Sequence, residues 1–312
     1  MKILFIDTAH PVLQKLLEEN KHVCDDGSKL SREEVLKIIP GYEGVIIRSR
    51  IRIDKEILDT AINLKFIARA GAGMESIDVN YAESKGIVCL NSPEGSRDAV
   101  GEHTIALLLA LFNNLNKADR EVREGKWIRE GNRGREVHNK TIGIIGYGNM
   151  GSAFAKKLSG FGCNVIAYDK YKKNFSVAGV KEVSLEQLFE QTEILSLHVP
   201  LSDETAFMVN DNFLNRFKKN IFVINVARGR ILKTDDLVKN MQEGKVLGAC
   251  LDVNEYEDSS FEKSAFSGES SWNYLINSDK VVFSPHIAGW TYESNEKISK
   301  VLFEKINNLF PV

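Results

Sequence analysis

The chain has 312 residues, of which 43% are hydrophobic and 27% charged, and its formal net charge is −2. This length allows two domains with separate cores, and the composition is typical of globular proteins. The small net charge excludes the strongly basic surface that nucleic-acid binding requires, so we expect no nucleic-acid partner.

The chain lacks the signatures of a targeting segment, a membrane span or a metal site. Only four consecutive apolar residues precede Asp7, and the longest apolar run, Ile105–Phe112, is far shorter than a membrane span. No His, Cys, Asp or Glu cluster has metal-ligand spacing, so no metal is expected. The cysteines are widely separated and are expected to be reduced thiols in or near cores: Cys24, Cys89, Cys163 and Cys250. These features predict a cytoplasmic protein without a membrane partner.

The first 95 residues alternate strand and helix patterns, which predicts a complete small α/β unit. Ser31 and Glu34 form a capping box that opens a helix ending near Ile39. The predicted strands are 2–6, 44–47, 65–70 and 87–90. The other predicted helices are 12–19, 54–61 and 79–85.

Turn residues at 91–95 interrupt this alternation, and one long helix is predicted from 98 to 123. Four of its apolar residues indicate a surface that faces the other domain or a second subunit: Ile105, Leu108, Leu109 and Phe112.

From residue 141 the alternation resumes with six predicted strands, which is typical of a doubly wound parallel sheet. These strands are 141–145, 164–169, 193–199, 221–226, 247–252 and 281–284. The helices between them are 150–159, 184–190, 211–217 and 235–243, and a last helix covers 292–309. Residues 255–279 resist assignment.

The first of these strands leads into a dinucleotide-binding fingerprint, Gly146-Tyr-Gly148-Asn-Met-Gly151. Its first glycine allows the tight turn, its second lets the backbone approach a pyrophosphate, and its third lets the helix pack against the strand. Asp169 ends the next strand 18 residues beyond Gly151, close to the offset of about 20 at which a carboxylate binds the adenine ribose. The pattern predicts NAD as cofactor; an ordinary βα turn is the alternative.

Three polar residues follow strand ends of this sheet, where ligands of doubly wound folds bind. Arg228 can hold a substrate carboxylate, His286 can exchange a proton, and Glu257 can orient the imidazole and stabilise its charged form. This set would suit hydride transfer to a 2-oxo acid. A surface ion pair for the arginine and a structural role for the histidine remain open alternatives. The other histidines are interpreted as structural: His10, His22, His103, His138 and His198.

Six segments in order resemble the D-isomer-specific 2-hydroxyacid dehydrogenases over essentially the whole chain. They are ARAGAGMESID, IGIIGYGNMG, LHVPLSDET, INVARG, GACLDVNEYE and SPHIAG. The resemblance implies a Rossmann-type NAD-binding domain (96–286) inserted into a flavodoxin-like substrate domain (1–95 plus 287–312). Two departures are visible. The Pro-rich turn that many members have after the catalytic glutamate is replaced by Asp258-Ser-Ser-Phe, and no C-terminal regulatory domain is expected after Val312.

The resemblance also assigns site residues. The catalytic set is Arg228, Glu257 and His286. The cofactor set is Gly146, Gly148, Asn149, Met150, Gly151, Asp169, Val199, Pro200, Ala227 and Asp252, with Asp252 holding the nicotinamide carboxamide. Backbone groups of Ala72 and Gly73 would bind the substrate carboxylate.

Arginines at two strand ends of the first domain, Arg48, Arg50 and Arg69, suit a second anionic group on the substrate. Ion pairing with Asp54, Glu56 or Glu75 is the alternative. The segments IIRSR and ARAGAG resemble those of 3-phosphoglycerate dehydrogenases, which predicts a small, phosphorylated 2-hydroxy or 2-oxo acid substrate and a step towards serine. Glyoxylate or hydroxypyruvate reductase, erythronate-4-phosphate dehydrogenase and a non-catalytic NAD-responsive interaction protein are the alternatives. The family also implies a homodimer in which the helix 98–123 and the segment through Trp127 embrace the partner.

Overall fold

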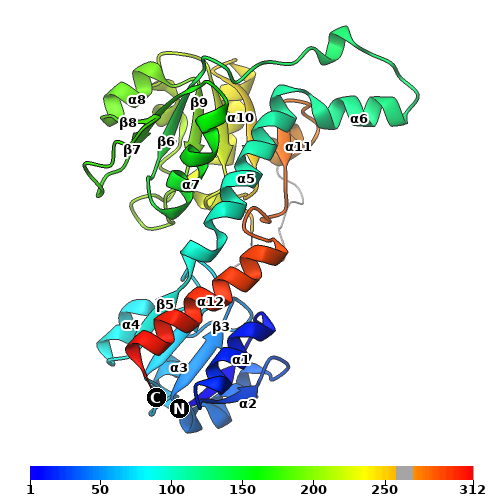
Figure 1. The fold of residues 1–312 in the computed structure, drawn as a ribbon. Coiled ribbons are helices and arrows are strands. Elements are labelled where there is room, and N and C mark those ends of the chain that lie inside the picture. Colours follow the sequence, from blue (N-terminus) through cyan, green and yellow to red (C-terminus); the bar gives the residue numbers. More distant parts are fainter. Residues whose placement is uncertain (258–269, 312) are drawn as a thin grey trace. The chain divides into compact units, whose positions relative to one another are not determined.

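The computed structural model describes residues 1–257 and 270–311, and these form two compact units. Residues 1–97 and 290–311 make the first unit, and residues 98–257 and 270–289 make the second. Each unit is a fully parallel β-sheet with helices on its faces, as predicted (Figure 1). The unassigned segment 255–279 lies partly outside the described residues.

The first unit has five strands in the order β2-β1-β3-β4-β5, which is the flavodoxin-like order. The strands are β1 (Lys2–Phe5), β2 (Val23–Asp26), β3 (Gly44–Ile47), β4 (Phe66–Arg69) and β5 (Val88–Asn91). The helices are α1 (Pro11–Glu19), α2 (Arg32–Ile38), α3 (Lys55–Thr60), α4 (Val79–Ser84) and α12 (Tyr292–Leu309). One buried cluster joins the sheet to α2, α3 and α4, and a second joins it to α1 and α12.

The Ser31 capping box is present, with the serine hydroxyl accepting from the Glu34 amide and the Glu34 carboxylate accepting from the Ser31 amide. Strand β2 is an addition that the sequence pattern did not indicate. Its sequence, VCDD, has little apolar character because the strand lies at the sheet edge, with exposed or half-buried residues throughout.

The second unit has seven parallel strands in the order β12-β11-β10-β9-β6-β7-β8. They are β6 (Thr141–Ile145), β7 (Asn164–Tyr168), β8 (Val180–Glu182), β9 (Ile194–Leu197), β10 (Ile221–Asn225), β11 (Val246–Leu251) and β12 (Val281–Phe283). The helices are α5 (Pro93–Phe112, from residue 98), α6 (Leu115–Arg123), α7 (Asn149–Lys157), α8 (Leu185–Gln191), α9 (Asp211–Asn215), α10 (Thr234–Gln242) and α11 (Ser270–Ile276). Strand β8 and helix α11 were not predicted. The strand order reverses between β6 and β9, so a ligand crevice is expected at their carboxyl ends.

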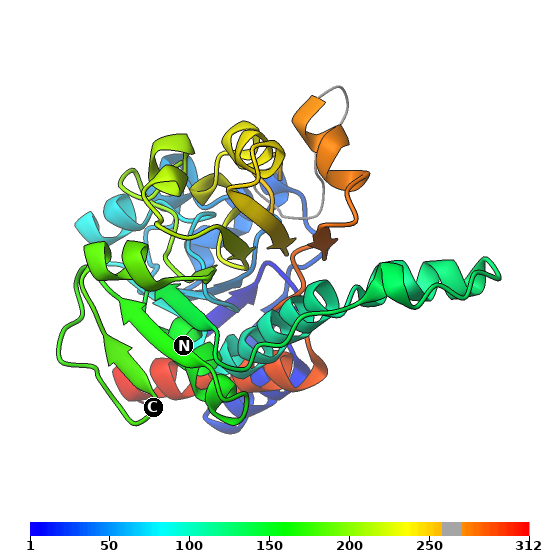
Figure 2. The same ribbon diagram turned by 90° about the horizontal axis from the view of Figure 1, so that it is seen from above.

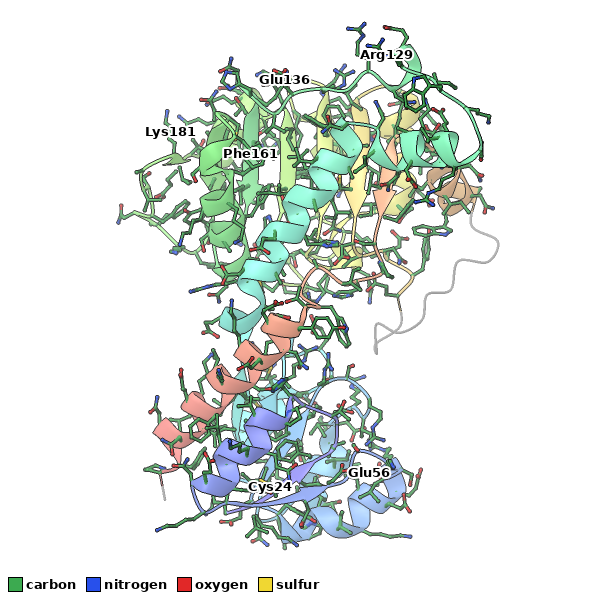
Figure 3. The ribbon with its side chains drawn as sticks, turned by 45° about the vertical axis from the view of Figure 1, so that its right-hand side comes forward. Cys24, Glu56, Arg129, Glu136, Phe161 and Lys181 are labelled. Atoms are coloured by element: carbon green, nitrogen blue, oxygen red, sulfur yellow. The ribbon has the colours of Figure 1, made fainter. Side chains whose placement is uncertain are left out.

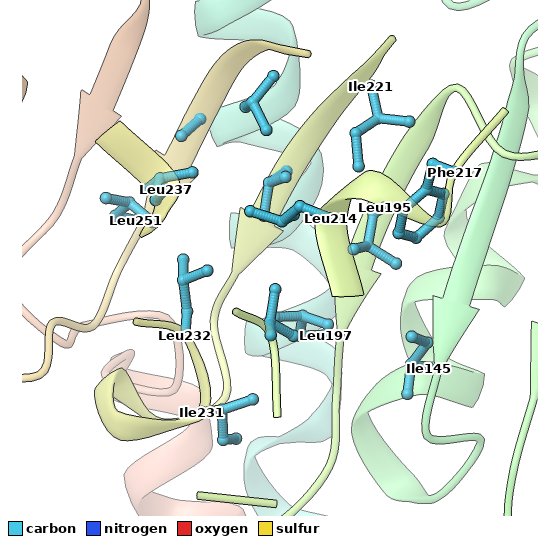
Figure 4. Packing of buried hydrophobic residues seen from close by; sticks show 14 of the residues in the cluster. Ile145, Leu195, Leu197, Leu214, Phe217, Ile221, Ile231, Leu232, Leu237 and Leu251 are labelled. Atoms are coloured by element: carbon cyan, nitrogen blue, oxygen red, sulfur yellow. The ribbon is translucent and has the colours of Figure 1, made fainter. Parts of the chain in front are cut away.

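Two buried clusters fix this sheet between its helices. One face packs on α8, α9, α10 and α11 through Leu195, Leu214 and Leu251 among others (Figure 4). The other face packs on α5 and α7, with Phe112 and Phe154 fully buried. Burying each such side chain stabilises the unit by about 1.5–3 kcal/mol, so the strand ends that carry the site are held rigidly.

The predicted single helix 98–123 is divided into α5 and α6. The break falls at Asn114, whose φ of 51° is incompatible with a continuous right-handed helix. The interpretation of Leu108 and Phe112 as surface residues is wrong, because they are 1% and 2% exposed within the core of their own unit. Ile105 and Leu109 are partly buried against the same core.

Helix α6 and residues 124–140 form an arm that projects from the sheet of the second unit (Figure 2). The arm carries exposed charges such as Arg129 and Glu136 (Figure 3). It also carries exposed apolar side chains: Leu115 (59% exposed), Val122 (53%), Trp127 (82%) and Ile128 (46%). In this part of the chain the exposed large apolar side chains are therefore on the arm rather than on α5.

The four cysteines are free thiols, and burial raises the pKa of Cys24 to about 12 and that of Cys89 to about 11. No described helix is long and apolar enough to cross a bilayer. Across residues 1–257 and 270–311, no group of three or more His, Cys, Asp or Glu is arranged to hold a metal ion.

Candidate active site

The glycine turn between β6 and α7 has three differently constrained glycines. A Cβ atom on Gly146 (φ 92°) would lie 2.5 Å from the His198 carbonyl oxygen, and one on Gly151 would lie 2.0 Å from the Gly146 carbonyl oxygen. A Cβ on Gly148 would meet nothing within 4 Å, and Gly148 caps α7 without a side-chain hydrogen bond. Packing within the chain thus requires glycine at the first and third positions. The middle position opens onto space beside the helix N-terminus, the place where the dinucleotide-binding fingerprint predicts a pyrophosphate.

Asp169 follows β7 and is held by three backbone amides. Its Oδ2 accepts from the Tyr147 N–H at 2.8 Å, and its Oδ1 accepts from the N–H groups of Tyr171 and Lys172 at 2.9 Å. Partial burial opposes ionisation, but the amides of Lys172, Tyr147 and Tyr171 outweigh it and keep the pKa of this carboxyl below its usual value. The result is a fixed anion beside the glycine turn, which suits a ribose diol.

The remaining predicted cofactor residues surround the same sheet edge. Asn149 and Met150 form the first turn of α7. Val199 and Pro200 follow β9, and Ala227 follows β10. The Val199 side chain lies 3.0 Å from the Cβ position of Gly146. Since β9 pairs with both β6 and β10, these residues share the carboxyl edge of the sheet.

A buried asparagine shapes the turn that carries Arg228. Asn225 is 1% exposed, its Nδ2 donates to the Arg228 carbonyl at 3.0 Å, and its Oδ1 accepts from the Ala227 N–H at 3.1 Å. The Arg228 guanidinium is half-buried and its Nη1 donates to the Ala227 carbonyl at 2.7 Å. A Cβ on Gly229 would lie only 1.7 Å from the Asn254 carbonyl oxygen. The arginine turn therefore packs directly on the segment that follows β11.

That segment carries Glu257, which contacts His286. Glu257 Oε2 lies 2.7 Å from His286 Nδ1, while Oε1 accepts from the Asn254 backbone N–H at 2.5 Å. Both side chains are largely buried, with 11% and 23% exposed. His286 has a φ of 55°, a left-handed conformation that costs about 1–2 kcal/mol for a non-glycine residue. Surrounding contacts hold it there, including its N–H, which donates to the Asp252 carbonyl at 2.7 Å.

Asp252, at the end of β11, has a fully enclosed carboxylate. Oδ1 accepts from the Ser284 hydroxyl at 2.5 Å and from the Ile287 N–H at 2.9 Å, and Oδ2 accepts from the Ala288 N–H at 2.9 Å. In this structure Asp252 anchors the turn that carries His286. Its predicted contact with a nicotinamide carboxamide stays a prediction.

The structure brings two of the three predicted substrate arginines together in the first unit and directs the third elsewhere. The Arg69 Nε donates to the Arg48 carbonyl at 3.4 Å, and the Arg48 guanidinium stacks 4.3 Å above the Trp290 ring. A Cβ on Gly71 would lie 1.6 Å from Arg69 Nη1, so this side chain lies across the turn that leads to Ala72 and Gly73. Asn91 donates to the Ala72 carbonyl at 2.6 Å and supports that turn.

The Arg50 guanidinium binds groups of its own chain. Its Nε donates to buried Asp7 at 3.2 Å, Nη1 donates to the Leu30 carbonyl at 2.7 Å, and Nη2 donates to the Ile6 carbonyl. The internal ion pair that was the alternative for these arginines therefore applies to Arg50, with Asp7 in place of the partners considered. Asp54 and Glu56 instead pair with Arg32.

Sequence reasoning missed three supporting residues: Asn225, Ser284 and Trp290. Asn225 and Ser284 lie within the motifs INVARG and SPHIAG, whose charged or titratable residues are Arg228 and His286. Trp290 follows SPHIAG directly, and an aromatic residue so close to a site motif is the signal that could have found it.

Comparison with known proteins agrees with this geometry. The family model described as "D-isomer specific 2-hydroxyacid dehydrogenase, NAD binding domain" matches residues 105–288. The chain is 36% identical to hydroxypyruvate reductase of Thermotoga maritima, covering 94% of this chain and 92% of that protein. It is 35% identical to D-3-phosphoglycerate dehydrogenase of Archaeoglobus fulgidus over 99% of this chain, but spans only 57% of that protein.

Among solved structures, D-lactate dehydrogenase from Aquifex aeolicus, complexed with NAD and lactic acid, superposes with a TM-score of 0.82. The two sequences are 28% identical, and the match covers 99% of this chain and 95% of that one. The two-unit fold and the NAD-binding region are thus shared with enzymes of one family. The chain belongs to the D-isomer specific 2-hydroxyacid dehydrogenases.

Proposed function

We propose that this protein is an NAD-dependent dehydrogenase that interconverts a small 2-hydroxy acid and its 2-oxo acid. The observation that carries the proposal is the contact between Glu257 Oε2 and His286 Nδ1 at 2.7 Å, made on a strained turn at the carboxyl edge of the nucleotide-binding sheet. A histidine oriented by a carboxylate through one ring nitrogen presents the other to a substrate as acid or base.

The residues have distinct roles in this reaction. Bound NAD supplies or accepts the hydride. Arg228 holds the substrate carboxylate and polarises the C2 oxygen with its planar guanidinium. In the reductive direction the His286 Nε2 gives a proton to that oxygen, and Glu257 stabilises the charged imidazole before transfer. In the oxidative direction the same nitrogen takes the proton back.

The cofactor contacts follow from the glycine turn. Gly148 and the first turn of α7 would bind the pyrophosphate, and Asp169 would accept from the ribose hydroxyls. The first unit would be the substrate domain, with the backbone of Ala72 and Gly73 binding the substrate carboxylate.

We favour 3-phospho-D-glycerate, oxidised to 3-phosphohydroxypyruvate, as the substrate. Two half-buried arginines, Arg48 and Arg69, lie at strand ends beside the turn that we propose for the substrate carboxylate, with Arg69 Nε donating to the Arg48 carbonyl, and a phosphate would suit their guanidinium groups. Stacking on Trp290 would fix the orientation of Arg48. Arg50 is left out of the proposed phosphate-binding residues, because its guanidinium binds Asp7 and the Leu30 carbonyl. Reduction of hydroxypyruvate or glyoxylate is the second candidate, because the relative that matches over nearly its whole length is named a hydroxypyruvate reductase.

NADH oxidation with a panel of 2-oxo acids tests both the proposed dehydrogenase activity and the proposed substrate. We expect phosphohydroxypyruvate to exceed hydroxypyruvate and glyoxylate in kcat/KM, and Arg48→Ala and Arg69→Ala to narrow that gap by at least tenfold. Arg52→Ala, at an exposed arginine nearby, is the matched control. A preference for the unphosphorylated acids would reject the phosphate assignment alone. NADH binding without turnover of any acid would favour the non-catalytic alternative.

Two variants test the catalytic roles. His286→Ala should lower kcat by about 10²–10⁴, the usual contribution of a positioned acid or base. Arg228→Lys keeps the charge but loses the bidentate geometry, so KM should rise sharply. Values of kcat/KM within about twofold of wild type for both variants would refute the assignment.

We also propose a homodimer formed through the arm. Trp127, Ile128 and Val122 line a surface hollow of about 150 Å³ and are largely exposed within one chain. Large exposed apolar side chains that share one hollow, here beside Glu121, Lys126 and Arg129, are typical of an interface.

A further inference from the structure

His103 was interpreted from the sequence as a structural histidine, but it has a partner in the site. It lies on α5, and its Nε2 is 2.8 Å from the Ser284 hydroxyl oxygen and 3.6 Å from Asp252 Oδ1. The imidazole is 23% exposed and the Asp252 carboxylate is fully enclosed. His103, which precedes Ser284 by 181 positions in the sequence, therefore contacts the residues that support the turn carrying His286.

The direction of each hydrogen bond can be assigned from chemistry. Ser284 donates its single hydroxyl proton to Asp252 Oδ1 at 2.5 Å. The serine oxygen is then an acceptor, so His103 must donate to it from a protonated Nε2. The three residues form one directed chain from α5 to Asp252.

Asp252 in turn forms hydrogen bonds with the turn that carries His286. Its side chain accepts from the N–H groups of Ile287 and Ala288, and its carbonyl accepts from the His286 N–H. These bonds enclose the residue whose φ is 55°. If the carboxylate rotated, the amides on the far side of His286 would lose their acceptor, and the left-handed conformation would lose its support.

We propose that His103 is a positioning residue which, through Ser284 and Asp252, holds His286 in the left-handed conformation that aims its ring at Glu257 and the substrate. The inference rests on the proposed function only for its effect on catalysis. Its effect on the turn is independent of any activity.

Four single variants and one double variant separate a positioning role from a packing role. His103→Leu and Ser284→Ala remove the donor and the relay, and each should lower kcat about tenfold, the worth of one hydrogen bond. The KM for the 2-oxo acid and the Kd for NADH should stay within twofold, because neither residue is proposed to touch a ligand. His103→Gln and Ser284→Thr keep an N–H donor and a hydroxyl, so they should recover kcat to within about threefold. The double variant His103→Leu/Ser284→Ala should be no worse than Ser284→Ala alone, since the two act in series.

Hydrogen exchange gives a readout that needs no turnover. In His103→Leu and Ser284→Ala the amides of Ile287 and Ala288 should exchange at least tenfold faster than in wild type, while amides in β6 and β7 stay unchanged. His138→Leu, at an exposed histidine outside this network, is the matched control. Unchanged exchange at both amides would overturn the inference even if the enzyme is active. A uniform loss of kcat and protection in all four variants would also overturn it, because that outcome marks a packing role. Faster exchange in a protein without dehydrogenase activity would support the positioning role and reject the proposed function.

Discussion

His198 provides a quantitative test of the nucleotide-binding sheet, because it is a buried histidine without a charged partner. It follows β9, its Nε2 lies 2.8 Å from the Ser196 hydroxyl oxygen, and its ring lies against Phe154. Among the described residues its Nδ1 has no hydrogen-bond partner. Burial lowers the pKa of His198 from 6.5 to about 3, since the apolar surroundings disfavour the imidazolium.

The sign and size of the effect on stability follow from linkage. The folded pKa is below the unfolded value, so the unfolded state binds the proton first as the pH falls. The stability that the neutral His198 side chain contributes to the folded state is therefore fully present above pH 6.5. It is lost progressively as the pH falls below that value. For one such histidine, the free energy of unfolding should fall by about 2 kcal/mol between pH 7 and pH 5.

Urea denaturation of wild type, His198→Gln and His138→Gln at both pH values isolates this contribution. Glutamine keeps a polar partner for Ser196 but does not titrate. We therefore expect His198→Gln to lose about 2 kcal/mol less than wild type on acidification, whatever its stability at pH 7. The exposed His138 should leave the pH dependence unchanged when replaced. Equal pH dependence in all three proteins would refute the reasoning.

Three further predictions concern the cofactor and the arm. Gly148→Ala should keep the melting temperature, because its Cβ meets open space in the chain, but it should raise the Kd for NADH at least tenfold. Gly151→Ala should instead destabilise the unit, because its Cβ would lie 2.0 Å from a carbonyl oxygen. Calorimetric melting and NADH fluorescence titration distinguish the two cases, and a Gly148→Ala protein that binds NADH normally would contradict the pyrophosphate placement. Asp169, whose carboxyl pKa is kept below its usual value by three backbone amides, should favour NADH over NADPH at least tenfold in kcat/KM, and equal values would remove the basis for this preference. Trp127→Ser should shift a dimeric mass towards the monomer in light scattering at micromolar concentration, and a monomeric wild type would reject the interface.

Most of the fold could be predicted because its signals are local. A capping box marks α2, apolar runs of four to six residues mark the central strands, and the glycine spacing marks the turn before α7. The missed strands, β2 and β8, are short edge strands in which all residues except Val180 are exposed or half-buried, so their sequences lack the apolar run of a buried strand. The break between α5 and α6 depends on one left-handed residue, Asn114, which no hydrophobic period marks.

The candidate site likewise has residues that the sequence predicts and supporting residues that it does not. Arg228, Glu257 and His286 come from three strand ends, and a parallel sheet brings strand ends to one edge, so their convergence follows from the strand order β12-β11-β10. What could not be predicted is the support: Asn225 shapes the arginine turn, and Asp252 holds the histidine turn. Such contacts depend on which atoms face each other after folding, and residue types at sequence spacing do not determine that.

The arginines of the first unit illustrate this limit most clearly. Arg48 and Arg50 are two positions apart after the same strand, so composition and spacing treat them as equivalent. One buried carboxylate separates them: Asp7, at the end of neighbouring β1, accepts from the Arg50 guanidinium and from the Arg48 backbone N–H. Burying an ionised carboxylate without a partner would be costly, so Arg50 is required where it lies. Arg48 donates its backbone N–H to Asp7, and its guanidinium stacks on Trp290. Arg50→Ala should therefore lower the melting temperature, whereas under the proposed substrate assignment Arg48→Ala should change specificity for the phosphorylated acid.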